Sequence, residues 1–483
     1  MRSTLSSGLL RSSFVVWFLT IGSCGGTAVP VVPPAPAPPP PTASTATKEP
    51  EPAPPPPEPA PPPPEPPKPM LSTTAFLSTV FSSPRFDAQP LGYLRTGARV
   101  VRAAEPTTGT DVHRCAGGWY RVEPFGYLCN GSYGVTSQLD DPRVQVSGRY
   151  PPKSAPLPYG YGMALGAVAY ARIPTSEEQR AAEGDIAAWR KQQAEQRAKV
   201  PVDKQWPELA MPVEAIPPFL ENHEAVAAIL GATPKGVRAG YVGHSVRLSF
   251  LTAFESEGRP FYLTTEHLIV PADRVKAARL TKFHGVELAG TGPRLPVVWM
   301  RYASDRLAAF VYALDGDGVT KTELTLPYQT WAGVADADVV VKGVRYHELL
   351  AAPAGGQAGV RYLVKGPEAT RLDAAKALPD PKLGPTEVWI EVSLSKQTLV
   401  VYEGLTPRYT TLISSGAGGK ARSTPVGQFR VHQKHVTTRM HGQERPAAAP
   451  GEEPEHYYRF DDVPYTQYIV GGIALHAAFW HDG

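Results

Sequence analysis

The chain has 483 residues, enough for about three domains at roughly 150 residues each. Basic residues exceed acidic residues by only three, 48 against 45, and no long basic run lies outside the N-terminus, so we expect no nucleic-acid partner. Of the 54 prolines, 22 lie between Pro30 and Pro69, so the rest of the sequence has an ordinary globular composition.

Residues 1–23 have the pattern of an export signal. Arg2 and Arg11 lie before a short apolar run, FVVWFL. This run is too short to span a bilayer. The run leads into IGSC, which resembles the lipobox of bacterial lipoproteins. This resemblance implies cleavage before Cys24, lipidation of its sulfur and anchoring to a membrane. In lipoproteins of this type, Gly25 in place of an acidic residue after the cysteine implies the periplasmic face of the outer membrane. The alternative is an ordinary secretory signal with an incidental cysteine.

Residues 24–70 are mainly proline, alanine and glutamate, a composition that cannot form a packed core. We expect a disordered linker in extended polyproline II conformation. Its proline-rich part would reach on the order of 120 Å at about 3.1 Å per residue, far enough to hold a folded part well away from a membrane.

Residues 71–148 contain short β-type runs separated by turn residues, which predicts a small β-barrel. The runs GYL, RTGARV and GGWYRV resemble bacterial Src-homology-3-like domains, which often accompany cell-wall enzymes. In an oxidising compartment Cys115 and Cys129 are expected to form a disulfide, and a zinc pair is the weaker alternative. A disulfide between these cysteines would close a loop of about 15 residues and stabilise the folded domain by about 3 kcal/mol. Trp119 and Tyr120 either pack in this domain or contact a ligand.

Two further segments precede the C-terminal part. Residues 149–234 are expected to be a linker with a helix at 176–199, broken or weakened near Gly184, because alanine, glutamate and arginine dominate there. Residues 235–375 contain short runs of β-branched and aromatic residues, which predicts a β-rich accessory module without indicating its ligand. The whole chain is therefore predicted to be mainly β and multidomain.

Residues 386–483 carry four motifs in order. These are KQTLVVYEG, SSGAGGKARSTPVGQF, VPYTQYI and GGIALHAAFW. In this order and spacing they resemble the successive motifs of the L,D-transpeptidase catalytic domain. The resemblance implies a β-sandwich-like fold with a mobile lid at Met440–Pro464, where glycine, proline and charge also favour a loop.

The resemblance also implies an activity: acyl transfer between peptidoglycan stem peptides through a cysteine thioester, giving 3-3 cross-links in cell-wall biogenesis. It assigns the general base to His476, whose ring would be oriented by the carbonyl of Ala477. It assigns substrate contacts to Tyr465, Gly472 and Trp480. The implied partner is peptidoglycan, and no cofactor is expected.

Other histidines do not suggest a metal site. His432, His435, His441 and His456 match no common zinc spacing, so solvated strand and lid positions are the preferred interpretation.

The nucleophile is the unresolved part of this interpretation. The family places its cysteine in an SHGC motif downstream of the histidine, and the printed sequence ends at Gly483 without one. We therefore expect the chain as written to be inactive. The first hypothesis is an L,D-transpeptidase whose sequence is incomplete. The second is a non-catalytic peptidoglycan-binding envelope lipoprotein, and the third is amide hydrolysis or protein attachment by a complete form.

Overall fold

The computed structural model describes residues 13–17, 68–110, 113–148, 156–221, 236–301, 308–416, 423–442 and 458–481. Its strands lie in several separate sheets, so the predicted mainly β fold is confirmed. Within these residues no helix is long and apolar enough to cross a membrane. Cys24 and residues 24–67 of the expected linker lie outside the described residues.

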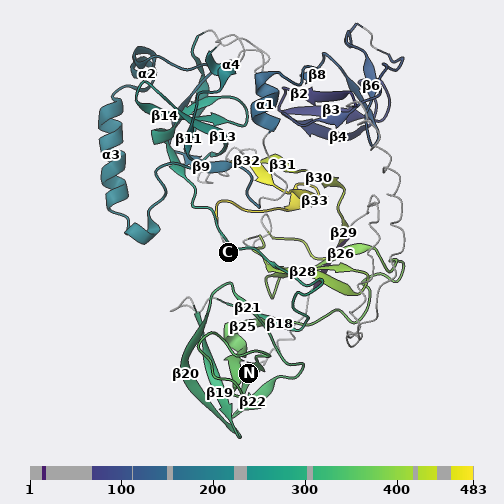
Figure 1. Cartoon of the computed structure of the whole chain (residues 1–483), viewed down its shortest axis with the longest axis vertical. Coiled ribbons are helices and arrows are strands. Elements are labelled where there is room, and N and C mark those ends of the chain that lie inside the picture. The colour runs from purple at the N-terminus through teal and green to yellow at the C-terminus, as the bar shows by residue number, and fades with distance from the viewer. Residues whose placement is uncertain are drawn as a thin grey trace, which may run out of the picture.

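Residues 68–148 form the N-terminal unit, at the upper right of Figure 1. Its elements are β2 (Met70–Thr73), β3 (Leu77–Phe81), β4 (Pro90–Arg95), β5 (Val100–Val101), β6 (Trp119–Arg121), β7 (Tyr127–Cys129), β8 (Val135–Thr136) and α1 (Pro142–Gly148). The strands form a sheet of order β5-β2-β8 and a sheet of order β4-β3-β7-β6. Where a small β-barrel was expected, the structure has two short sheets with Leu71, Val122 and Leu128 buried in one cluster.

Residues 156–280 form the middle module. Its strands are β9 (Gly160–Ala164), β10 (Ala167–Tyr170), β11 (Val213–Glu214), β12 (Arg238–Val242), β13 (Arg247–Ser256), β14 (Arg259–Thr264), β15 (Ile269–Pro271) and β16 (Val275–Ala277). They belong to a ten-stranded sheet in which β13 pairs with β9, β11, β14 and β32. The segment expected to be a linker thus supplies β9 and β10, because their apolar residues complete this core.

The middle module also contains three helices. They are α2 (Ser176–Glu183), α3 (Ile186–Ala198) and α4 (Pro218–Glu221). Thr175 and Glu178 form a capping box at the start of α2, and Asp185 caps α3. Gly184 between the two helices has φ 77, a conformation that favours glycine. The predicted break near Gly184 is confirmed.

Residues 297–372 form the distal module, at the bottom of Figure 1. Strands β18 (Val297–Met300), β21 (Trp331–Gly333) and β25 (Ala369–Leu372) form one sheet. Strands β19 (Ala308–Asp315), β20 (Gly318–Pro327), β22 (Val339–Val341), β23 (Val344–Glu348) and β24 (Arg361–Lys365) form the other. The β-rich segment predicted at 235–375 is thus divided between two separate cores.

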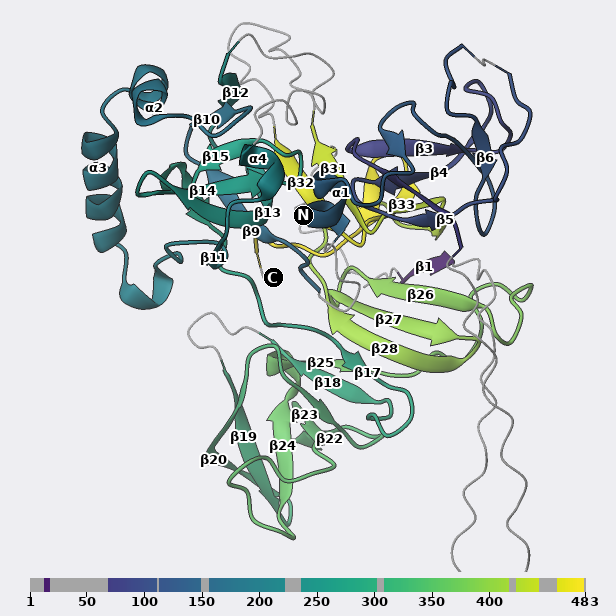
Figure 2. The same cartoon turned by 45° about the horizontal axis from the view of Figure 1, so that its top comes forward.

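The C-terminal residues contribute to three sheets. Strands β26 (Val388–Ser393), β27 (Thr398–Glu403), β28 (Thr406–Leu412) and β29 (Gln428–Arg430) lie in a six-stranded sheet with β17 (Val286–Glu287) and β1 (Ser13–Trp17). Strands β30 (Gln433–Lys434), β33 (Gln467–Val470) and β34 (Ile473–Leu475) form a three-stranded sheet. Strands β31 (Thr437–His441) and β32 (Arg459–Pro464) belong to the ten-stranded sheet, and Figure 2 shows them between the middle module and the N-terminal unit.

Both faces of β26 are buried, which gives this part its sandwich character. Successive residues of a strand point to opposite faces. Ile390 packs in a cluster with Ile469 of β33, whereas Trp389 packs in another with Trp299 of the distal module and Tyr402. The six-stranded sheet therefore lies between the three-stranded sheet and the distal module.

Strand β1 comes from the segment expected to be an export signal. It pairs antiparallel with β26 and parallel with β29, filling the position between them. Ser13–Trp17 thus form a strand of the six-stranded sheet and also lie in the segment expected to be an export signal.

Candidate active site

His476 directly follows β34 at the edge of the three-stranded sheet. The residue keeps solvent-exposed surface although protein atoms surround much of its ring, and its Nδ1 lies 3.1 Å from the carbonyl oxygen of Ala477. A carbonyl oxygen only accepts hydrogen bonds, so Nδ1 carries the proton in this arrangement. Nε2 is then left with the lone pair that a general base requires.

The protein surroundings shift the ionisation of His476. Neighbouring protein atoms displace water around the ring and lower its pKa; the Ala477 carbonyl acts in the opposite direction, and nearby His481 lowers it further. The pKa of His476 is therefore below the ordinary value of an imidazole, and the neutral form predominates at neutral pH. Neutral imidazole is the form that accepts a proton from a thiol.

The three residues expected to contact substrate lie at different distances from His476. The ring of Trp480 is 5.5 Å from the ring of His476 and 4.2 Å from that of Phe460. Tyr465 follows β32 with φ 51, and the adjacent Pro464 accepts a hydrogen bond of 3.0 Å from the backbone N–H of Ala477. Gly472 lies at the opposite end of β34, on the order of 13 Å away along an extended chain.

Two buried residues to which the sequence analysis assigned no role lie close to this site: Phe479, within the motif that contains His476, and Asp462, just before the motif VPYTQYI. Phe479 is 3 % exposed and stacks on Tyr161 of β9, with ring centroids 4.0 Å apart. Asp462 in β32 is fully buried and has φ 51. The pair of acidic residues at 461–462, within an apolar strand pattern, was the available signal for a buried ion pair.

The cysteines that the structure describes are not available as nucleophiles. Cys115 and Cys129 are joined by a disulfide in the N-terminal unit, so neither sulfur is a thiolate. Residues 387–483 contain no cysteine. Among the described residues, no group of three His, Cys, Asp or Glu side chains is placed to hold a metal ion.

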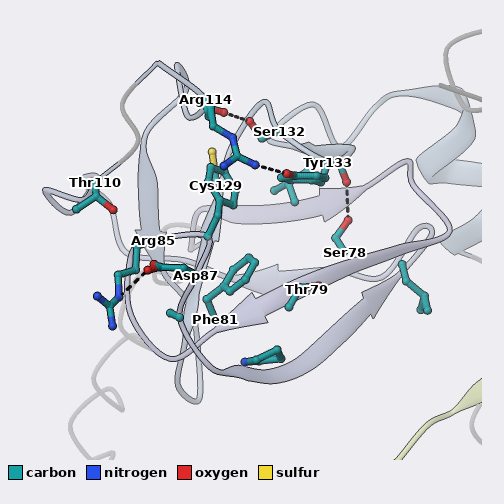
Figure 3. A pocket seen from close by; sticks show the side chains of 15 residues that line it. Ser78, Thr79, Phe81, Arg85, Asp87, Thr110, Arg114, Cys129, Ser132 and Tyr133 are labelled. Carbon is teal, nitrogen blue, oxygen red and sulfur yellow. Dashed lines mark hydrogen bonds and ion pairs between the residues drawn. The ribbon is translucent and has the colours of Figure 1, made fainter. Parts of the chain in front are cut away.

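A separate cavity of about 790 Å³ lies in the N-terminal unit (Figure 3). Two arginines on its wall are paired: Arg85 lies 3.5 Å from Asp87, and Arg114 donates a 2.6 Å hydrogen bond to the hydroxyl of Tyr133. The guanidinium of Arg114 also lies over the ring of Phe86, 4.6 Å from its centroid. The cavity thus combines aromatic surface with two cationic groups.

The comparison with known proteins gives one match. Residues 387–482 match the YkuD family, the L,D-transpeptidase catalytic domain. No curated protein and no solved structure matches the chain. The matched region contains His476, Trp480, Tyr465 and Gly472 together with all strands from β26 to β34. Residues 387–482, the part of the chain that carries the candidate base, therefore match the L,D-transpeptidase catalytic-domain family.

Proposed function

We propose that residues 387–482 carry out acyl transfer on peptidoglycan stem peptides in cell-wall biogenesis, with His476 as general base. The observation that carries this proposal is the position of His476 within the family match, with Nδ1 against a carbonyl and Nε2 left as the acceptor. Trp480 and Tyr465 are proposed to line the substrate site.

The proposed reaction has two steps. Nε2 of His476 takes the proton of a cysteine thiol, and the thiolate attacks the carbonyl carbon of the third stem residue. As the tetrahedral species collapses, the protonated imidazole returns the proton to the nitrogen of the leaving D-alanine, and a thioester remains. An amine of a second stem then attacks the thioester, loses a proton to His476 and releases the thiol as the new amide forms.

The cysteine for this reaction is not among residues 387–483. The proposed reaction therefore requires a cysteine from outside these residues, which the L,D-transpeptidase family carries in a Ser-His-Gly-Cys motif downstream of the histidine. Sequencing the DNA downstream of codon 483 is the direct test. A continuation that encodes this motif in any frame supports the proposal, and its absence rejects the transpeptidase assignment.

Acylation by a carbapenem gives a second, chemical test. We expect the mature lipoprotein, with the sequence as printed, to form no covalent adduct by mass spectrometry, because Cys115 and Cys129 are bonded to each other and the sulfur of Cys24 is proposed to be lipidated. In a completed chain an adduct should form, and replacing the downstream cysteine with alanine should abolish it together with 3-3 cross-links. His476→Gln should slow acylation by about 10²–10⁴-fold, while His441→Gln, on β31, should leave it unchanged. Equal rates in both variants would remove His476 from the mechanism.

Non-catalytic binding of peptidoglycan is a second candidate, favoured by the cavity in the N-terminal unit. Its cationic and aromatic groups suit peptides that carry carboxylates. Co-sedimentation of the full chain with purified sacculi tests it. Arg85→Glu should weaken binding and His476→Gln should not; the opposite pattern would place binding at the transpeptidase domain.

We also propose that the protein is exported and anchored by lipid at Cys24 to the outer membrane. The support is the IGSC pattern after an apolar run.

A further inference from the structure

Asp462 connects three parts of the molecule. Its carboxylate accepts hydrogen bonds from Ser249 of β13 at 2.5 Å, from Thr437 of β31 at 2.9 Å, and from Thr265. It also forms an ion pair of 2.6 Å with Arg95, which belongs to β4 of the N-terminal unit. The middle module, the N-terminal unit and the β31–β32 pair therefore meet at one buried carboxylate.

Tyr161 of the middle module contacts the chain on both sides of His476. Its hydroxyl donates to the backbone carbonyl of Asp462 at 3.4 Å, before His476 in the sequence. Its ring stacks on Phe479 after His476, with an interplanar angle of 17°. Tyr161 is fully buried, and Phe479 belongs to the core cluster of the middle module.

Residues 462–479 thus form a segment that is held at both ends by the same neighbouring unit. Within the segment, the backbone N–H of Ala477 donates to Pro464 at 3.0 Å, which joins the two ends directly. His476 lies one residue before this bond, and its ring is 5.5 Å from Trp480, which follows Phe479.

We propose that the middle module positions His476, with Tyr161 and Phe479 as positioning residues and the Arg95–Asp462 ion pair as the second anchor. This inference rests on the proposed role of His476 as general base. The middle module would then contribute to catalysis by fixing the position of the His476 ring.

The structure offers a matched control for the test. Phe250 and Tyr262 form a second buried stack in the same module, with centroids 4.1 Å apart and an interplanar angle of 18°. Like Tyr161, Tyr262 uses its hydroxyl in a bond to the backbone, accepting from the N–H of Ala210 at 2.8 Å. Phe250 and Tyr262 belong to a different buried cluster from the one that contains Tyr161 and Phe479.

The experiment measures the pKa of His476 by NMR in the full chain, in wild type and in four variants. Phe479→Leu and Tyr161→Phe should raise this pKa towards about 6.5, the value of a solvated imidazole, because the segment loosens and water returns. Phe250→Leu and Tyr262→Phe should leave it unchanged. A second readout is the rate at which diethyl pyrocarbonate modifies His476, measured relative to the exposed His244 in the same sample.

The outcomes distinguish residues that position His476 from residues that only stabilise the fold. If Phe479→Leu lowers the melting temperature as much as Phe250→Leu does but leaves the pKa and modification rate of His476 unchanged, the stack is structural and the inference is wrong. Neither readout requires catalysis. Failure of a completed chain to form cross-links would therefore reject the proposed function without deciding this inference.

Discussion

Asp462 and Arg95 show how a buried charge is stabilised at a junction between units. Burial by itself lowers the pKa of Arg95, but the charges of Asp462 and the hydroxyl of Tyr159 outweigh it, and the pKa is raised. Arg95 therefore remains charged, and it also donates to the Tyr159 hydroxyl at 3.1 Å. Because the ion pair is buried, removing either side chain would leave the charge of the other without a partner and without water.

Replacing Arg95 with methionine should lower the free energy of unfolding by about 3 kcal/mol, since Asp462 would remain buried without its cation. Urea denaturation followed by circular dichroism measures the change. Arg408→Met is the matched control, because Arg408 and Glu403 form a more exposed pair whose loss should cost at most about 0.5 kcal/mol. Equal losses in the two variants would show that the Arg95 pair does not stabilise the junction.

At the scale of elements, the β31–β32 pair is the least expected feature. Both strands lie inside the family match, yet they hydrogen-bond into the ten-stranded sheet, where Phe460 of β32 pairs with Arg247 of β13. A second group of charges supports this docking: Glu266 of the middle module faces Arg459 at 3.1 Å and also contacts Arg439. The mobile lid was expected at Met440–Pro464, but the end of β31 and all of β32 lie in this segment as paired, docked strands.

The β6–β7 hairpin provides a test of local stability. Cys115 and Cys129 lie beside the buried Trp119, and their bond closes a loop with a sequence separation of 14. Replacing both cysteines with serine should destabilise the N-terminal unit by about 3 kcal/mol, because the unfolded chain gains conformational freedom. Hydrogen exchange read by mass spectrometry should show faster exchange in β6 and β7 and unchanged exchange in β13 and β14. Unchanged exchange in the hairpin would contradict the prediction.

At the scale of the whole molecule, the export proposal has a structural consequence. Cleavage before Cys24 would remove Ser13–Trp17, the residues that form β1 between β26 and β29. The mature protein would then lack this strand.

We expect wild-type protein to incorporate a palmitate analogue and to fractionate with the outer membrane, and Cys24→Ser to do neither. The mass of the mature N-terminus provides the independent check: a chain that begins at lipidated Cys24 supports the proposal. A mature chain that retains residues 13–17 would contradict it and would leave β1 as a permanent part of the sheet.

The sequence alone determined the class of fold, the break between α2 and α3 at Gly184, and the candidate base. Alternating apolar residues predict strands because side chains of a strand point to two faces, and the order of four motifs identified the region that contains His476. These are local patterns, readable within a few dozen residues.

The tertiary structure alone decided which distant residues contact the segment around His476. Tyr161 contacts Asp462 across 301 residues, and Ser249 contacts it across 213. Periodicity shows that a side chain is buried but not which distant segment buries it, so the linker expected at 149–234 could not be recognised as part of a ten-stranded sheet. A buried carboxylate requires partners, and those partners come together only when the sheet has formed.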